Sequence, residues 1–205
     1  MDYSKLANKE IIDKTIKSLE EKGYSVFAVE NGVEALEKIK LIIPKGASVM
    51  NGTSTTLNQI GYADFLKSGN TGWNDLHTKI VSENDPEKRK ELRKQSTMSD
   101  YYLGSVHAMA ENGEFIIASN SGSQLPHVAF TSSNLIFVVG TQKIVPNLDE
   151  AMKRLEEYVY PLEDKRMKSL YGVGSGISKI LIFKKENPAM GRKVNIILVN
   201  KNLGF

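Results

Sequence analysis

The chain has 205 residues, of which 40% are hydrophobic and 25% charged, with 16 glycines and 6 prolines. This is the composition of an ordinary globular protein, and the length suffices for a single domain over residues 1–205 with a substantial core. The sequence contains no cysteine. Disulfides, thiolate metal sites, cysteine-ligated iron–sulfur clusters and a cysteine nucleophile are therefore all excluded.

Charge and hydropathy argue against a nucleic-acid-binding protein, a membrane-spanning protein and a secreted protein. The net charge of +3 is too small to predict nucleic-acid binding. No apolar run approaches the roughly 18 residues that cross a bilayer, and the first residues lack the pattern of a signal peptide. We therefore expect a cytoplasmic protein that does not contact a membrane. The three histidines, His77, His107 and His127, have no metal-binding spacing, so no metal or other cofactor is expected.

The N-terminal third alternates helices with short strands. Ile12, Ile16 and Leu19 fall at helical spacing and predict a helix over about residues 4–22 that packs on the domain. Gly23 is a typical end for that helix. The following pattern predicts a strand over 24–29, a helix over 33–43 and a strand over 47–50.

A charged stretch follows at residues 83–95. Asp85 is a suitable N-cap and Pro86 a suitable first residue for a helix. A solvated helix is the favoured interpretation, ahead of a nucleic-acid patch.

The second half is richer in strands. Asn112-Gly113 is a hairpin turn signal. Asn147 and Glu150 have the spacing of a helix-capping box. The strands are predicted over 105–110, 114–119, 135–139, 180–183 and 194–199. The alternation of strands and helices predicts an α/β fold, with a mostly parallel sheet flanked by helices and an attached antiparallel hairpin.

Hydroxyl side chains are concentrated between the 47–50 strand and the next helix. Ligands of open α/β sheets bind beyond the carboxyl ends of strands, where free amides favour anions. One interpretation is a cradle for a phosphate or carboxylate, and the other is a simple helix cap. The candidate ligand-binding residues are Gly52, Thr53, Ser54, Thr55 and Thr56.

A second polar loop follows the 114–119 strand. Its side chains and amides are suited to ligand binding, although an ordinary connection between strands is an equal alternative. Lys143, after the 135–139 strand, could supply a countercharge for an anion or could be a surface lysine. The candidate loop residues are Asn120, Ser121, Gly122, Ser123 and Gln124.

Glu111 is the candidate catalytic residue. It precedes the Asn112-Gly113 turn, where a carboxylate facing a cleft could act as base or nucleophile. The spacing alone favours a solvated flank of the turn. The GVGSG run at 172–176 does not have the spacing of a dinucleotide-binding motif and is expected to be a flexible loop.

Several stretches resemble the LUD domain family of lactate-utilisation proteins. They are NGTSTTLNQIG at 51–61, SDYYLGSVHAMAENGEFI at 99–116, SNSGSQ at 119–124, NLIFVVGTQKIVPNLDEAMKRL at 134–155, PLEDKR at 161–166 and GRKVNIILVNKNLGF at 191–205. The resemblance implies a fold like that of ribose-5-phosphate isomerase, glucosamine-6-phosphate deaminase and the CoA-transferases. It also implies oxidoreductase partner proteins, because some relatives act with iron–sulfur proteins in oxidising L-lactate.

One departure and two short matches qualify this resemblance. Many relatives have a cysteine cluster where this chain has residues 169–190 without cysteine, so a cluster role there is excluded. Gly52-Thr53-Ser54-Thr55 is similar to the phosphate loop of the sugar-phosphate isomerases. Glu111-Asn112-Gly113 is similar to the Glu-Asn-Gly of class I CoA-transferases, in which the glutamate is the nucleophile.

The leading hypothesis is a LUD-type protein that binds a small anionic metabolite, linked to lactate utilisation. One alternative is a sugar-phosphate isomerase or an acyl- or CoA-transferase that uses Glu111. Another is a non-catalytic subunit or regulator of an oxidoreductase, with Tyr62, Phe65 and Trp73 in an exposed apolar patch. Whether the protein is an enzyme, and its oligomeric state, stay open at this point.

Overall fold

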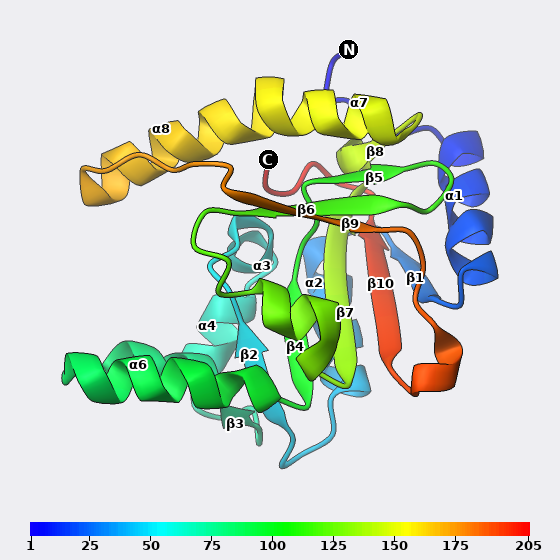
Figure 1. Cartoon of the computed structure of the whole chain (residues 1–205). Coiled ribbons are helices and arrows are strands. Elements are labelled where there is room, and N and C mark those ends of the chain that lie inside the picture. The colour runs from blue at the N-terminus through cyan, green and yellow to red at the C-terminus, as the bar shows by residue number, and fades with distance from the viewer.

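Six parallel strands form the larger of two sheets (Figure 1). The computed structural model describes residues 1–205 except for the side chain of Pro188. In spatial order the strands are β1 (Ser25–Val29), β10 (Lys193–Val199), β7 (Asn134–Gly140), β4 (Tyr101–Gly104), β2 (Ser48–Asn51) and β3 (Asn74–Asp75). All of their pairings are parallel, which confirms the predicted α/β class.

The smaller sheet lies across the carboxyl ends of these strands (Figure 1). Its order is β8 (Ile144–Val145), β5 (Ala108–Ala110), β6 (Phe115–Ser119) and β9 (Lys179–Phe183). The predicted hairpin is confirmed, because β5 and β6 are antiparallel and Gly113 adopts φ 81° at their turn. A left-handed φ of this kind costs glycine little, which explains the Asn-Gly pair.

The strand predicted over 105–110 is wrong in its extent. Residues Tyr101–Gly104 form β4 of the large sheet, and the chain then crosses to the small sheet before β5 begins at Ala108. The alternation of Val106, Ala108 and Ala110, all buried, resembles one continuous strand in sequence. The crossing places Ser105, Val106 and His107 between the two sheets.

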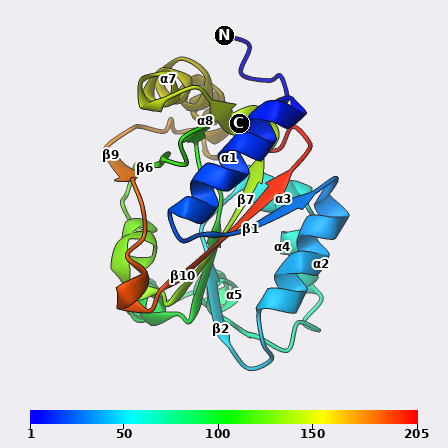
Figure 2. The same cartoon turned by 90° about the vertical axis from the view of Figure 1, so that its right-hand side faces the viewer.

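Eight α-helices surround the sheets. Side-chain caps begin several of them. Asp85 and Asn147 accept backbone N–H bonds of the first turn as predicted, and Asn31, which was not predicted as a cap, does the same for its helix. The helices are α1 (Lys9–Glu21), α2 (Gly32–Ile42), α3 (Thr55–Gln59), α4 (Tyr62–Lys67), α5 (Leu76–Ser82), α6 (Pro86–Gln95), α7 (Leu148–Lys153) and α8 (Tyr160–Tyr171). The π-helical segment Arg154–Val159 joins α7 to α8. Near the edge of the large sheet, α1 and α2 flank β1 (Figure 2).

The core lies on both faces of the large sheet. Successive side chains of β7 point to opposite faces, so Phe137 and Val139 join one apolar cluster while Ile136 and Val138 join the other. Helix α1 contributes Leu19 to the first cluster, and α2, α3 and α4 contribute to the second. The apolar run at 135–139 therefore has the expected cause, a strand covered on both faces.

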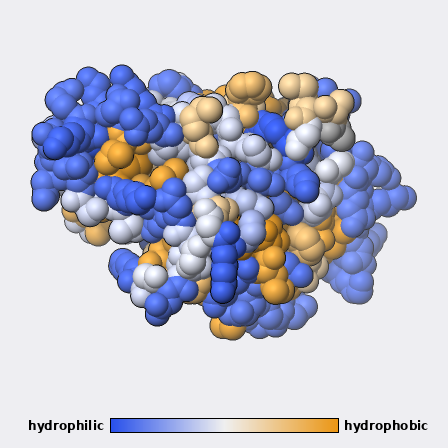
Figure 3. All heavy atoms as spheres, turned by 90° about the horizontal axis from the view of Figure 1, so that it is seen from below, coloured by the Kyte–Doolittle hydropathy of each residue, from blue (hydrophilic) through white to orange (hydrophobic). Residues whose placement is uncertain are grey.

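Helices α6 and α8 extend beyond the sheets on the same side of the molecule (Figure 1). Neither has a buried residue among those described. Hydrophilic side chains predominate on the side of the molecule where α6 lies when it is seen from below (Figure 3), as predicted for a solvated helix. None of the helices in the described part of the chain combines the length and apolar composition needed to cross a bilayer.

Candidate functional site

A cavity of about 630 Å³ opens at the carboxyl ends of the large sheet. Both polar loops singled out in the sequence line it, although they lie far apart in the chain. From the first loop come Gly52, Thr53, Ser54, Thr55 and Thr56, and from the second come Asn120, Ser121, Ser123 and Gln124. Strand β2 ends immediately before the first loop and β6 immediately before the second, so strand ends bring the loops together.

The first loop combines a helix cap with free backbone donors. Ser54 Oγ accepts the Leu57 N–H at 3.3 Å and so caps α3. Among the described residues, none accepts a hydrogen bond from the backbone amides of Thr53, Thr55 or Thr56. The capping interpretation therefore accounts for Ser54 but not for the unpaired amides beside it.

Gly52 lies where the side chains of Tyr102 and Gln124 approach the first loop closely. A Cβ at this position would lie 3.0 Å from Tyr102 Oη and 3.3 Å from Gln124 Oε1. Tyr102 Oη in turn donates to Gln124 Oε1 at 3.3 Å. A side chain at position 52 would crowd Tyr102 and Gln124 and so disturb the contact between β4 and the second loop.

The second loop is held mainly by its own polar groups. Gln124 Nε2 donates to Ala118 O at 3.0 Å, and Gly122 N donates to Ser119 Oγ at 2.9 Å. Gly122 has φ 84° and does not line the cavity. Its neighbours Ser121 and Ser123 do line it, so Gly122 shapes the turn that presents them.

Lys143 lies at the wall of the cavity and is 3% exposed. Its Nζ donates to Thr56 Oγ1 at 3.2 Å, to Ser105 Oγ at 3.1 Å and to Val106 O at 3.2 Å. No carboxylate among the described residues forms an ion pair with it. Burial, together with the charge of Arg154, lowers the pKa of Lys143 to about 7.

Arg154 is a second buried cation, and sequence reasoning missed it. Its side chain is 0% exposed and lies 5.9 Å from the Tyr3 ring and 5.2 Å from the Tyr158 ring. One nitrogen donates to His107 O, whereas Nε and Nη2 have no hydrogen-bond partner among the described residues. The sequence signal that could have predicted its burial is its position beside Ala151 and Leu155, on the apolar face of a predicted helix.

His107 lines the cavity as a neutral hydrogen-bond donor. Its Nδ1 accepts the Ala118 N–H at 3.1 Å, so the ring proton is on Nε2. Burial, and then the charges of Lys143 and Arg154, lower the pKa of His107 to about 3. The ring therefore stays uncharged at neutral pH.

The outer part of the cavity is formed by α6, α8 and the GVGSG loop. Arg93 of α6 lines it, together with Glu163 and Arg166 of α8. The Arg166 guanidinium binds both Glu163 carboxylate oxygens at 2.7 Å. Ser175 N donates to Asp164 Oδ1 at 2.9 Å, which fixes the loop against α8. The described cavity wall thus has three basic side chains, those of Arg93, Lys143 and Arg166, and one acidic side chain, that of Glu163.

Glu111 does not lie in this cavity. Its carboxylate pairs with Lys14 of α1 at 2.7 Å, because the β5–β6 hairpin places its turn beside that helix. Tyr62, Phe65 and Trp73 pack on one another and against the second apolar cluster, and Tyr62 is 0% exposed. They do not form the exposed apolar patch expected from the sequence. No described group of histidines and carboxylates could hold a metal ion.

Comparisons with other proteins agree with this architecture. The LUD domain family model matches residues 12–199. The fold is similar to the crystal structure of a DUF162 family protein from Deinococcus radiodurans, with a TM-score of 0.57 and 12% sequence identity, over 96% of this chain and 100% of that one. No curated protein matches the sequence. Since the family model covers most of its length, the chain belongs to the LUD domain family.

Proposed function

We propose that the protein binds a small anionic metabolite, a carboxylate or a phosphate, in the cavity between its two sheets. The observation that carries this proposal is the buried pair of cations, Lys143 and Arg154, neither of which has an ion-pair partner among the described carboxylates. Removing a charge from water without a counter-ion costs several kcal/mol. An anionic ligand beside Lys143 supplies the missing charge.

The donors around the cavity support an anion as the occupant. The residues that carry the unpaired amides, Thr53, Thr55 and Thr56, line the same cavity as Lys143 and His107. These groups all donate hydrogen bonds at neutral pH, and charge-assisted hydrogen bonds to an anion are among the strongest in proteins. The cavity volume of about 630 Å³ lies within the range of small-molecule sites, roughly 300–1,000 Å³.

Membership in the LUD domain family makes lactate utilisation the first biological context to test, with oxidoreductases as the partner class. The enzyme alternative that uses Glu111 is disfavoured, because this carboxylate pairs with Lys14 outside the cavity. Binding is therefore proposed without assigning a catalysed reaction.

Isothermal titration calorimetry with L-lactate, ribose 5-phosphate and a CoA ester tests the proposal. At least one should bind, and Lys143→Met should weaken its binding by about a hundredfold, the usual effect of losing a buried charge partner. Lys17→Met is the matched control, because Lys17 is an exposed residue of α1 and should leave affinity unchanged. Absence of binding by all three ligands, at concentrations up to the millimolar range, would contradict the proposal.

A further inference from the structure

The Lys143 side chain carries the only amine among the described residues that line the cavity. Its Nζ is surrounded by oxygen atoms of Thr56, Ser105 and Val106, at 3.1 to 3.2 Å, and by no carboxylate. A buried ammonium that serves only as a structural charge normally has an anionic partner. An amine at a cavity wall that has hydrogen-bond acceptors but no anionic partner is placed for a chemical role in addition to its charge.

Building on the proposed anion site, we infer that Lys143 Nζ forms an imine with the carbonyl carbon of the bound anion. The ligand class is then a small anion that also carries a ketone or an aldehyde. A 2-oxo acid and an open-chain sugar phosphate share this chemistry. The free amides of the 53–56 loop hold the anionic group, while the carbonyl group faces Lys143.

The environment of Lys143 favours the uncharged amine that this reaction needs. Burial and the nearby Arg154 charge lower the pKa of Lys143 to about 7. At pH 7 the unprotonated fraction is then roughly a thousandfold larger than for a lysine of ordinary pKa near 10.4. Desolvation of this kind, often beside a second cation, is how lysine nucleophiles are activated.

The reaction balances without a redox partner. The nitrogen lone pair attacks the carbonyl carbon, forming a C–N bond while the carbonyl oxygen takes up a proton to become a hydroxyl. The nitrogen releases one proton, which gives a neutral carbinolamine. Protonation of that hydroxyl then lets water leave, and the C–N bond becomes a C=N bond. Addition of water reverses the sequence and releases the carbonyl compound.

Thr56 and His107 are placed to move these protons. Ser105 is not, because its Oγ donates to Val138 O at 2.7 Å and is firmly held. Thr56 Oγ1 lies 3.4 Å from Leu203 O, a weak contact that leaves its proton free to turn towards Nζ. Thr56 is therefore the residue that exchanges a proton with the amine, and the His107 Nε2–H can donate to the departing oxygen.

Borohydride trapping of the full chain tests the inference. The protein is incubated at pH 7 with pyruvate, the smallest keto 2-oxo acid, or with glyceraldehyde 3-phosphate, and is then reduced and digested for mass spectrometry. L-Lactate and glycerol 3-phosphate are the matched anions without a carbonyl. We expect a reduced adduct on the peptide containing Lys143 with at least one carbonyl ligand, and none with its matched anion. The yield should rise with pH around a midpoint near 7.

The variants separate this inference from anion binding. Lys143→Arg keeps the positive charge and should lose the adduct completely, whereas Lys17→Met should retain it. Calorimetric binding of these anions without any adduct at Lys143 would overturn the imine and leave the proposed function intact. Absence of both binding and adduct would overturn both. Equal labelling of Lys143 and exposed lysines would also count against the imine, because it would show no activation by the site.

Discussion

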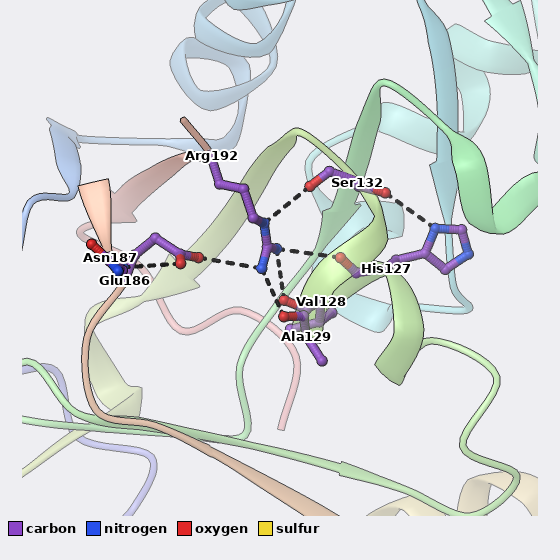
Figure 4. A network of polar contacts seen from close by, with 7 residues as sticks. All are labelled: His127, Val128, Ala129, Ser132, Glu186, Asn187 and Arg192. Carbon is purple, nitrogen blue, oxygen red and sulfur yellow. Dashed lines mark hydrogen bonds and ion pairs between the residues drawn. The ribbon is translucent and has the colours of Figure 1, made fainter. Parts of the chain in front are cut away.

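Arg192 pairs with Glu186 at 3.4 Å, and both side chains are nearly buried (Figure 4). The same guanidinium donates to the backbone carbonyl oxygens of Ala129 and Val128 at 2.8 Å and of Ser132 at 3.2 Å. These carbonyls lie at the end of the π-helical turn His127–Thr131, where the helix itself provides no partners. Arg192 thus joins the start of β10 to the segment that precedes β7.

Arg192→Ala should reduce the free energy of unfolding by about 3 kcal/mol, because the carbonyls of the buried residues Val128 and Ser132 lose a charged donor. Arg192→Lys should recover only a minor part, since an ammonium cannot match the planar guanidinium geometry. Urea denaturation followed by circular dichroism measures both. Glu186→Gln is the control: it removes the ion pair but leaves the bonds from Arg192 to the carbonyls, so its loss should be smaller. Equal losses for Ala and Gln would contradict the capping role.

The pH dependence of stability should reveal the buried Lys143. Its pKa falls from 10.5 to about 7 on folding, so the unfolded chain binds more protons than the folded protein between these values. The free energy of unfolding attributable to Lys143 should therefore rise with pH from 7 to 10, by up to about 1.4 kcal/mol per pH unit. Below pH 7 both states hold the proton, and the full penalty persists.

Urea midpoints at pH 6.5, 8 and 9.5 measure this effect as the difference between the wild type and Lys143→Met. The variant should be more stable than the wild type at pH 6.5, because an apolar side chain replaces an unpaired buried charge. The advantage should shrink as the pH rises. A difference that stays constant over this range would mean that Lys143 titrates normally.

The sequence predicted the strands and loops around the cavity better than its buried charges. The hydroxyl-rich 52–56 segment follows β2 of the parallel sheet, where ligands usually bind, and the 119–124 segment follows β6 of the small sheet, which lies across that edge. Lys143 also follows a strand, but nothing in its neighbours distinguished a buried amine from a surface one. That property depends on Ser105 and Val106, which the chain places between the sheets at a crossing that strand periodicity concealed.

Arg154 and Glu111 illustrate opposite errors of local reasoning. An arginine in a charged helical stretch is usually solvated. The apolar face of the predicted helix gave a local sign of burial, but the packing of Arg154 against Tyr3 depends on a segment 151 positions earlier in the chain. Glu111 matched a known short motif, yet its environment is set by Lys14 of α1. The environment of each residue is set by contacts with residues that are distant in the sequence.

Gly52→Ala should weaken ligand binding by about tenfold and reduce stability by roughly 1 kcal/mol, because the added methyl group overpacks the contact between loops. Calorimetry, with whichever of the three tested ligands binds the wild type, measures the affinity, and urea denaturation measures the stability. Gly176→Ala is the matched control on the same cavity wall, where a Cβ would find its nearest neighbour at 3.4 Å, an ordinary contact. Adding Tyr102→Phe should relieve the Gly52→Ala defect, since it removes the hydroxyl 3.0 Å from the new Cβ. Failure of this rescue would place the strain elsewhere.

Glu111→Gln should leave the affinity for an anionic ligand unchanged. The carboxylate lies outside the cavity wall, and its described ion-pair partner is the exposed amine of Lys14. Loss of this pair should reduce the free energy of unfolding by about 0.5 kcal/mol, as for other pairs with a solvent-exposed member, and less at high salt. Lys14→Gln should have the same effect, and the double variant should add little to either single change. A large loss of ligand binding in Glu111→Gln would instead place this carboxylate at the site and would support the alternative of a transferase that uses Glu111.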